Sequence, residues 1–203
     1  MTARLRSAAG LSLVEITIIL GVMAIISCVL APSGVHLIGQ ARDVRVMQDC
    51  QAIRGALVSM LNDLGRTNLR VGPGKGTLVE LLVTDGAIPE ARSDTEALWL
   101  RDVEASGTVD LIERHLITNE PAGSSAMSWQ PPLRSGAFGW RGAYLRSGVG
   151  ADPWGRRYSV NVAFLGQRPD VLVISSGPNG TIETPFTGVN LKYGGDDIAV
   201  LAK

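Results

Sequence analysis

The chain has 203 residues, of which 45% are hydrophobic and 19% charged, and this composition excludes a wholly disordered protein. Its 19 basic and 19 acidic residues cancel, which argues against a strongly basic nucleic-acid-binding protein, and two cysteines are too few for a disulfide scaffold. All aromatic residues lie between Trp99 and Tyr193, so we expect a stem without aromatics followed by a globular part.

The first predicted element is an apolar segment from Leu11 to Ala31, which as a helix would be about 30 Å long, the thickness of a bilayer's hydrocarbon core. Arg4 and Arg6 precede it without a nearby acid, which predicts a cytoplasmic N-terminus and a single membrane crossing. A secretory signal peptide has a shorter apolar core, and Pro32 disfavours cleavage after Ala31. A plain anchor or a cleaved signal peptide is the alternative.

One carboxylate, Glu15, lies inside this apolar segment, where an ionised side chain is costly unless it has a partner. The segment contains no Lys or Arg, but cleavage after Gly10 would create a free amino group at Leu11. Residues 10–15, with the sequence GLSLVE, resemble the class III signal of type IV pilins and type II secretion pseudopilins, in which phenylalanine usually follows the glycine. The resemblance implies that residues 1–10 are a cytoplasmic leader. It also implies that a prepilin peptidase cuts between Gly10 and Leu11 and methylates Leu11, and that Glu15 acts in assembly.

Residues 32–64 continue the helical pattern as a periplasmic amphipathic half, and Gly65 is expected to end the helix. Its apolar face, with spacings of three and four, consists of Val46, Cys50, Ile53, Leu57, Met60 and Leu64. We expect this face to pack against a sheet, and Pro32 to bend or open the helix. Cys28 and Cys50 would lie about 33 Å apart on one helix, so both are expected to be free thiols.

Residues 65–135 are predicted to be a variable region of helices and loops. Short helices are expected at Thr77–Thr84, Asp94–Glu104 and Val109–Leu116, separated by glycine- and proline-rich turns. His115 has no cysteine or second histidine nearby, so it is expected to be a packing or surface residue rather than a metal ligand.

Residues 136–203 are predicted to form a C-terminal antiparallel β region. Strands are expected at Tyr158–Phe164, Asp170–Ser175 and Ile198–Leu201, and their short connections favour antiparallel neighbours. Asp152 precedes a proline in a turn, where its carboxylate is expected to accept hydrogen bonds from nearby backbone amides. The fold class is therefore expected to be α+β, with a long N-terminal helix packed on a small antiparallel sheet.

Two parts of this β region are similar to the major pseudopilin of type II secretion. The first is WRGAYL at 140–145 followed by DPWGRRY at 152–158, and the second is SSGPNG at 175–180 followed by DDI at 196–198. The resemblance implies a pilin-like fold and a calcium ion at the second part, where Asn179 replaces a usual aspartate. Asn179, Asp196 and Asp197, with loop carbonyls, offer the oxygen ligands that calcium prefers. Two solvated turn aspartates are the alternative.

Together these resemblances imply a structural subunit of a type II secretion pseudopilus, held in the bacterial inner membrane with its C-terminal domain in the periplasm. The expected partners are further copies of the chain in a helical fibre, the prepilin peptidase, minor pseudopilins and the inner-membrane assembly platform. Nucleic acid is not expected to bind. The sequence contains no recognisable catalytic constellation, so an enzyme is not expected. The alternatives are a major or minor type IV pilin for adhesion, motility or DNA uptake, and a membrane-anchored periplasmic binding domain or enzyme.

Overall fold

The computed structural model describes residues 12–65, 69, 78–92, 96–121, 136–165, 171–187 and 193–202, without the side chains of residues 29–35. The predicted leader and the cleavage site between Gly10 and Leu11 lie outside these residues. The chain divides into two compact units, Met1–Arg42 and Asp43–Lys203.

A single helix, α1 (Leu13–Leu64), accounts for the described part of the first unit and continues into the second. It is uninterrupted at Pro32, so a local opening of the helix there is wrong, while the alternative, a bend at Pro32, stays a prediction. The helix ends where predicted, and Gly65 follows with a φ of 59°, a left-handed conformation that suits glycine at a helix C-terminus. Among the described residues, no helix combines the length and the hydropathy needed to span a membrane.

The second unit is an α+β fold built on a mixed five-stranded sheet. The strands, in spatial order, are β3 (Val109–Leu111), β1 (Leu81–Val83), β4 (Ser159–Val160), β5 (Leu172–Ser175) and β7 (Ile198–Leu201). β1 and β3 run parallel, whereas the other neighbours are antiparallel. The α+β class is thus as predicted, but the purely antiparallel sheet is wrong, because β1 and β3 come from the region with the helical pattern.

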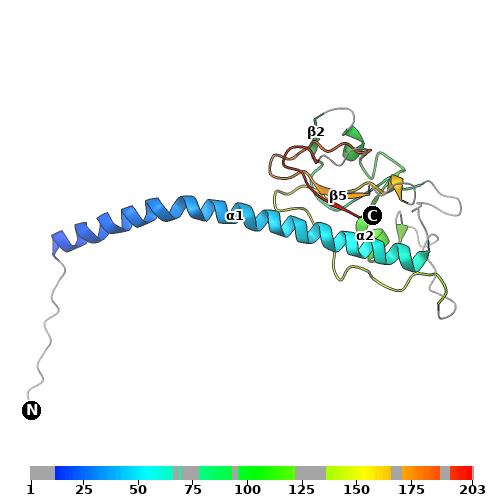
Figure 1. The fold of residues 1–203 in the computed structure, drawn as a ribbon, viewed down its shortest axis with the longest axis horizontal. Coiled ribbons are helices and arrows are strands. Elements are labelled where there is room, and N and C mark those ends of the chain that lie inside the picture. Colours follow the sequence, from blue (N-terminus) through cyan, green and yellow to red (C-terminus); the bar gives the residue numbers. More distant parts are fainter. Residues whose placement is uncertain are drawn as a thin grey trace, which may run out of the picture. The chain divides into compact units, whose positions relative to one another are not determined.

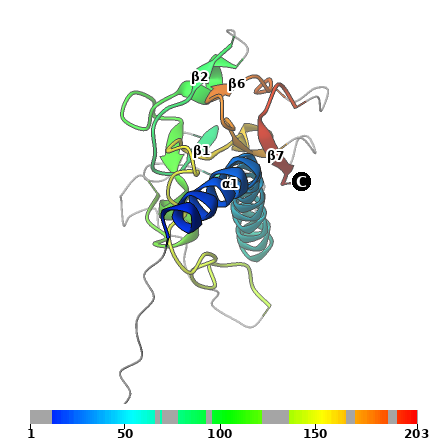
Figure 2. The ribbon, with the colours of Figure 1, turned by 90° about the vertical axis from the view of Figure 1, so that its left-hand side faces the viewer.

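A short parallel ribbon pairs β2 (Glu90–Ala91) with β6 (Thr181–Ile182) and forms part of a further layer. Figures 1 and 2 show the sheet between this ribbon and the part of α1 that belongs to the second unit. Alternate strand residues supply the two faces. Leu82 and Val173 pack with the α1 side, and Val83 and Ile174 pack with the ribbon side.

The predicted apolar face of the stem is confirmed as the centre of the larger core. Each of its six residues is at most 6% exposed: Val46, Cys50, Ile53, Leu57, Met60 and Leu64. They pack against Leu82, Val160 and Val173 of the sheet. On the opposite face, Trp99 is fully buried and its ring stacks edge-on against Phe186, with 4.8 Å between the ring centroids.

The three helices predicted in the middle region are wrong or much shorter. Thr77–Thr84 contains strand β1, because Leu81–Val83 pairs with a neighbour on each side. In the described part of the second prediction, residues 96–104, only the 3-10 helix η1 (Ala97–Leu100) is helical. Val109–Leu116 begins as β3 and becomes helical only in α2 (Ile112–Leu116). Long-range pairing therefore overrides the local helical pattern.

The three predicted C-terminal strands agree better with the structure. β7 has the predicted bounds, and β5 occupies most of the predicted apolar run, with one neighbour on each side. The strand predicted at Tyr158–Phe164 is shortened to β4, because the chain turns into the 3-10 helix η4 (Val162–Phe164).

Candidate functional site

The N-terminus of α1 is closed by a reciprocal pair of hydrogen bonds between Ser12 and Glu15. The Ser12 amide donates to Glu15 Oε2 at 2.9 Å, and the Glu15 amide donates to Ser12 Oγ at 3.2 Å. The Ser12 hydroxyl also donates to Oε2, at 3.1 Å. This is a capping box, and the signal that could have predicted it is the Ser-x-x-Glu spacing of residues 12–15. Glu15 therefore has local partners within its own chain, while its predicted pairing with a neighbour's amino group stays a prediction.

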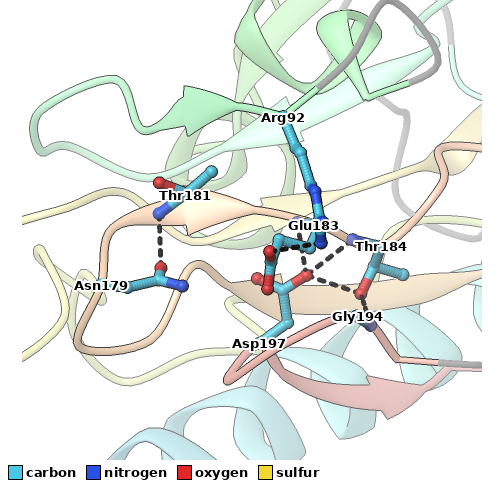
Figure 3. A network of polar contacts seen from close by, with 7 residues as sticks. All are labelled: Arg92, Asn179, Thr181, Glu183, Thr184, Gly194 and Asp197. Carbon is cyan, nitrogen blue, oxygen red and sulfur yellow. Dashed lines mark hydrogen bonds and ion pairs between the residues drawn. The ribbon is translucent and has the colours of Figure 1, made fainter.

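The predicted calcium ligands lie on two loops that the fold brings together, one before β6 and one before β7. Asp197 Oδ2 accepts hydrogen bonds from the Glu183 amide at 2.9 Å, the Thr184 amide at 2.7 Å and the Thr184 hydroxyl at 2.6 Å (Figure 3). Its other oxygen, Oδ1, is buried without a hydrogen-bond partner among the described residues. Burial raises the pKa of the Asp197 carboxyl in spite of the three hydrogen bonds.

Asp196 has the same asymmetry. Its Oδ2 accepts the Asn179 amide at 3.0 Å, and its Oδ1 is buried without a partner in the described part of the chain. The two loops approach closely because Gly177 has a φ of 62°, and a Cβ there would lie 2.2 Å from the Asp196 carbonyl oxygen. A glycine is required at this position, since any side chain would push the loops apart.

The Asn179 side chain is turned to its own loop. Its Oδ1 accepts the Thr181 amide at 2.7 Å, and Figure 3 shows the carboxamide beneath Thr181 rather than beside Asp197. The structure thus brings the Asn179 backbone to Asp196, while the amide oxygen proposed as a calcium ligand supports the turn before β6.

A third carboxylate, Glu183, adjoins this loop, and no sequence pattern singled it out. Its Oε1 accepts a hydrogen bond from Arg92 Nη1 at 2.9 Å, and a Cβ on Gly195 would overlap its Oε2. The negative charge of Glu183 is one of the causes that raise the pKa of Asp197. Only its position directly after β6, beyond the predicted turn, could have indicated this role.

The buried oxygens of the two loops offer a place for a cation. Asp196 Oδ1 and Asp197 Oδ1 are buried without a hydrogen-bond partner among the described residues, and a hard cation would satisfy them. Within the described residues, however, no group of three or more acidic, histidine or cysteine side chains converges as a metal site does. Asp196 and Asp197 fit the donor chemistry of calcium, and the remaining ligands would have to be backbone carbonyls or water.

Asp152 makes the hydrogen bonds expected of it and one more. Its Oδ1 accepts the amides of Trp154 at 3.0 Å and Arg156 at 2.9 Å, as predicted for this turn. Its Oδ2 accepts the hydroxyl of Ser175 at 2.7 Å, which joins the turn to the end of β5. The carboxylate is only 4% exposed and acts as a structural link.

His115 is fully buried, which agrees with the predicted packing role. Its Nε2 lies 2.9 Å from Asp110 Oδ2, and Asp110 Oδ1 also accepts a hydrogen bond from Arg114 at 3.0 Å. Both members of the pair are 0% exposed, so a substrate in solution could not reach them.

No protein-family model matches this chain, and searches of curated proteins and of solved structures found no match.

Proposed function

We propose that this chain is a pseudopilin-like structural subunit, which polymerises through its N-terminal helix into a fibre anchored in the bacterial inner membrane and assists type II protein secretion. The observation that carries this proposal is the apolar surface of α1 in the first unit. Ten large apolar side chains between Leu13 and Ile26 are each at least 45% exposed. At about 100° per residue, they occupy every side of the helix.

A helix that is apolar all round requires either a membrane or the core of an assembly. Each of these side chains would contribute roughly 1.5–3 kcal/mol on full burial, so their exposure to water would be strongly unfavourable. A subunit that leaves the bilayer for the centre of a fibre exchanges one apolar environment for another. This exchange needs no catalytic group, and the residues from Asp43 onward supply a folded domain on the same helix.

The processing step is tested by the intact mass of the protein extracted from membranes. We expect a mature chain that starts at a methylated Leu11, and we expect Gly10→Val to leave the precursor uncut. A mature chain that starts near Ser33 would indicate a signal peptide and would overturn the proposal.

The role of Glu15 is tested by a pair of substitutions that the capping box makes informative. Glu15→Gln keeps a side chain that can cap the helix but removes the charge, whereas Ser12→Ala keeps the charge and removes the hydroxyl of the cap. If Glu15 pairs with the amino group of a neighbouring subunit, Glu15→Gln should abolish fibres and Ser12→Ala should not. Fibres from Glu15→Gln would instead assign the carboxylate to helix capping alone.

Calcium binding at Asp196 and Asp197 forms part of the proposal, supported by their two buried oxygens, which have no hydrogen-bond partner in the described part of the chain. The alternative of a type IV pilin shares the same stem and predicts the same processing. The two are separated by deleting the gene: loss of protein export supports the pseudopilus, and loss of surface pili, motility or DNA uptake supports the pilin.

A further inference from the structure

The turn between β5 and β6 contains Asn179, which is the only asparagine of the chain that is followed by glycine. The Asn179 side chain is exposed, whereas Gly180 is buried. An Asn-Gly pair is chemically reactive, because glycine has no side chain to obstruct the attack of its backbone nitrogen on the preceding carboxamide. The turn therefore holds both partners of an intramolecular reaction, and the surrounding contacts determine how readily they react.

The carboxamide of Asn179 is held close to the peptide bond that follows it. Its Oδ1 accepts the Thr181 amide at 2.7 Å, a contact that folds the carboxamide back over the Asn179–Gly180 peptide bond. The Asn179 amide donates to Asp196 Oδ2 at 3.0 Å, which holds the backbone from the other loop. Asn179 Nδ2 forms no hydrogen bond with the described residues, and Figure 3 shows it without a contact to the residues drawn. The group that would leave as ammonia is therefore not held by the protein.

A positive charge lies against the attacking residue. A Cβ on Gly180 would overlap the guanidinium of Arg156, so this guanidinium lies directly on the Gly180 backbone. Arg156 forms no ion pair with the described residues. Its charge favours loss of the Gly180 amide proton, and the Thr181 amide stabilises negative charge that develops on Asn179 Oδ1. Both steps of an attack by Gly180 on Asn179 are thus supported by fixed groups.

We propose that Asn179 deamidates spontaneously in the folded protein and that Thr181 and Arg156 promote the reaction. The Gly180 nitrogen forms a bond to Asn179 Cγ, and the bond between Cγ and Nδ2 breaks. The Gly180 amide proton passes to water, while Nδ2 takes up a proton from water and leaves as ammonia. Water then opens the cyclic imide at either of its two carbonyls, which leaves an aspartate or an isoaspartate at position 179. The reaction consumes water and releases ammonia, and nothing is oxidised or reduced.

The two products differ in their effect on the fold. An aspartate keeps the main chain and adds a negative charge beside Asp196, and its carboxylate can still accept the Thr181 amide. An isoaspartate lengthens the main chain by one carbon directly before β6, where the Gly180 carbonyl accepts the Glu90 amide at 3.0 Å. Because Glu90 and Thr181 are paired in the ribbon, this product should weaken the pairing of β2 with β6. The inference depends neither on the proposed function as a fibre subunit nor on calcium binding.

The test is peptide mapping by mass spectrometry of the full chain, kept folded in detergent with chelator and incubated in water labelled with heavy oxygen. We expect the peptide with Asn179 to gain the mass that separates a carboxylic acid from an amide, together with one labelled oxygen. The peptide with Asn161 is the internal control and should not change. Asn161 is buried, precedes Val162, and has its carboxamide hydrogen-bonded to Phe186 and Leu172. An Asn179 peptide without labelled oxygen, after the denatured chain has converted, would overturn the inference.

The denatured chain also separates a promoted reaction from the ordinary reactivity of an Asn-Gly pair. Conversion should be at least fivefold faster in the folded protein than in the same protein in denaturant, and equal or slower conversion in the folded protein would overturn the inference. Arg156→Gln removes the guanidinium and should slow conversion of the folded protein at least threefold. Arg146→Gln, at an exposed arginine of another loop, is the matched control and should not change the rate. If Arg156→Gln folds and converts at the wild-type rate, the inferred role of Arg156 is overturned; if it does not fold, the comparison of folded and denatured wild type decides.

Discussion

Replacement of Asp152 by alanine is expected to be among the most destabilising single substitutions in the second unit. It removes the acceptor of three hydrogen bonds, from the amides of Trp154 and Arg156 and from the hydroxyl of Ser175. The hydroxyl can rotate to another acceptor, but the two amides are fixed by the turn. A hydrogen bond to a charged group contributes about 1.5–3 kcal/mol, so two lost bonds amount to about 3–6 kcal/mol.

Two effects reduce this figure. Removal of a carboxylate that is 4% exposed also removes its desolvation cost, and water can enter the space that the side chain leaves. We therefore expect Asp152→Ala to lower the free energy of unfolding by about 3 kcal/mol, a large part of a typical total of about 5–15 kcal/mol.

The assay is denaturant unfolding of the full chain in detergent, followed by tryptophan fluorescence. Asp152→Asn is the matched control: its amide oxygen can still accept both backbone amides, so it should lose only about 1 kcal/mol. Asp85→Ala, an exposed acid in another turn, should change the free energy by at most about 0.5 kcal/mol. If Asp152→Ala unfolds within about 0.5 kcal/mol of the wild type, these hydrogen bonds do not stabilise the turn and the expected role of Asp152 is wrong.

Three further predictions concern a buried thiol and the acidic loops. Burial, with the charges of Asp49 and Asp152, raises the pKa of the Cys50 thiol to about 12, so a water-soluble maleimide at pH 7.5 should leave Cys50 unlabelled until the protein is denatured, as intact mass would reveal. Asn179→Asp should tighten calcium binding if the side chain leaves Thr181 for the metal, and an unchanged affinity by titration calorimetry would place Asn179 outside the coordination shell. Calcium at about 1–10 mM should raise the midpoint of thermal unfolding, given the weak Kd of roughly 0.1–1 mM typical of extracellular sites.

The stem and the C-terminal strands could be predicted because their signals are local. An amphipathic face repeated over five turns identifies Val46 to Leu64, and four consecutive apolar residues identify β5. Strands β1 and β3 have only three residues each, too few to establish an alternating pattern, and their parallel pairing joins positions 28 residues apart. No local sequence pattern indicates this long-range pairing, so both segments were predicted to be helical.

The candidate site also had residues that could be predicted and residues that could not. Asp196 and Asp197 could be found through the resemblance of residues 175–180 and 196–198 to a pseudopilin, whereas the Ser-x-x-Glu spacing of Ser12 and Glu15 was present in the sequence and was not predicted to be a capping box. Glu183 could not be found, because its proximity to Asp197 arises only when β6 and β7 have folded. Likewise, Asp196 Oδ1 and Asp197 Oδ1 lack a hydrogen-bond partner among the described residues because the fold buries them, and burial cannot be recognised in these two loops from sequence alone.

The calcium prediction has a pH dependence whose sign follows from Asp197. The pKa of the Asp197 carboxyl is raised in the folded protein, chiefly by burial, so the folded state holds the proton more tightly than the unfolded state does. The stabilisation that comes from this proton is complete below the unfolded pKa of about 3.9, and it is lost as the pH rises through the pKa of the folded protein. Calcium binds the ionised form, so its stabilisation should appear over the same range and reach about 2.7 kcal/mol at a hundredfold excess over Kd. In chelator, the wild type should therefore lose stability relative to Asp197→Asn between pH 4 and pH 7, and calcium should reverse that loss. A calcium shift of equal size at pH 4 and pH 7, or one retained by Asp197→Asn, would place the ion elsewhere.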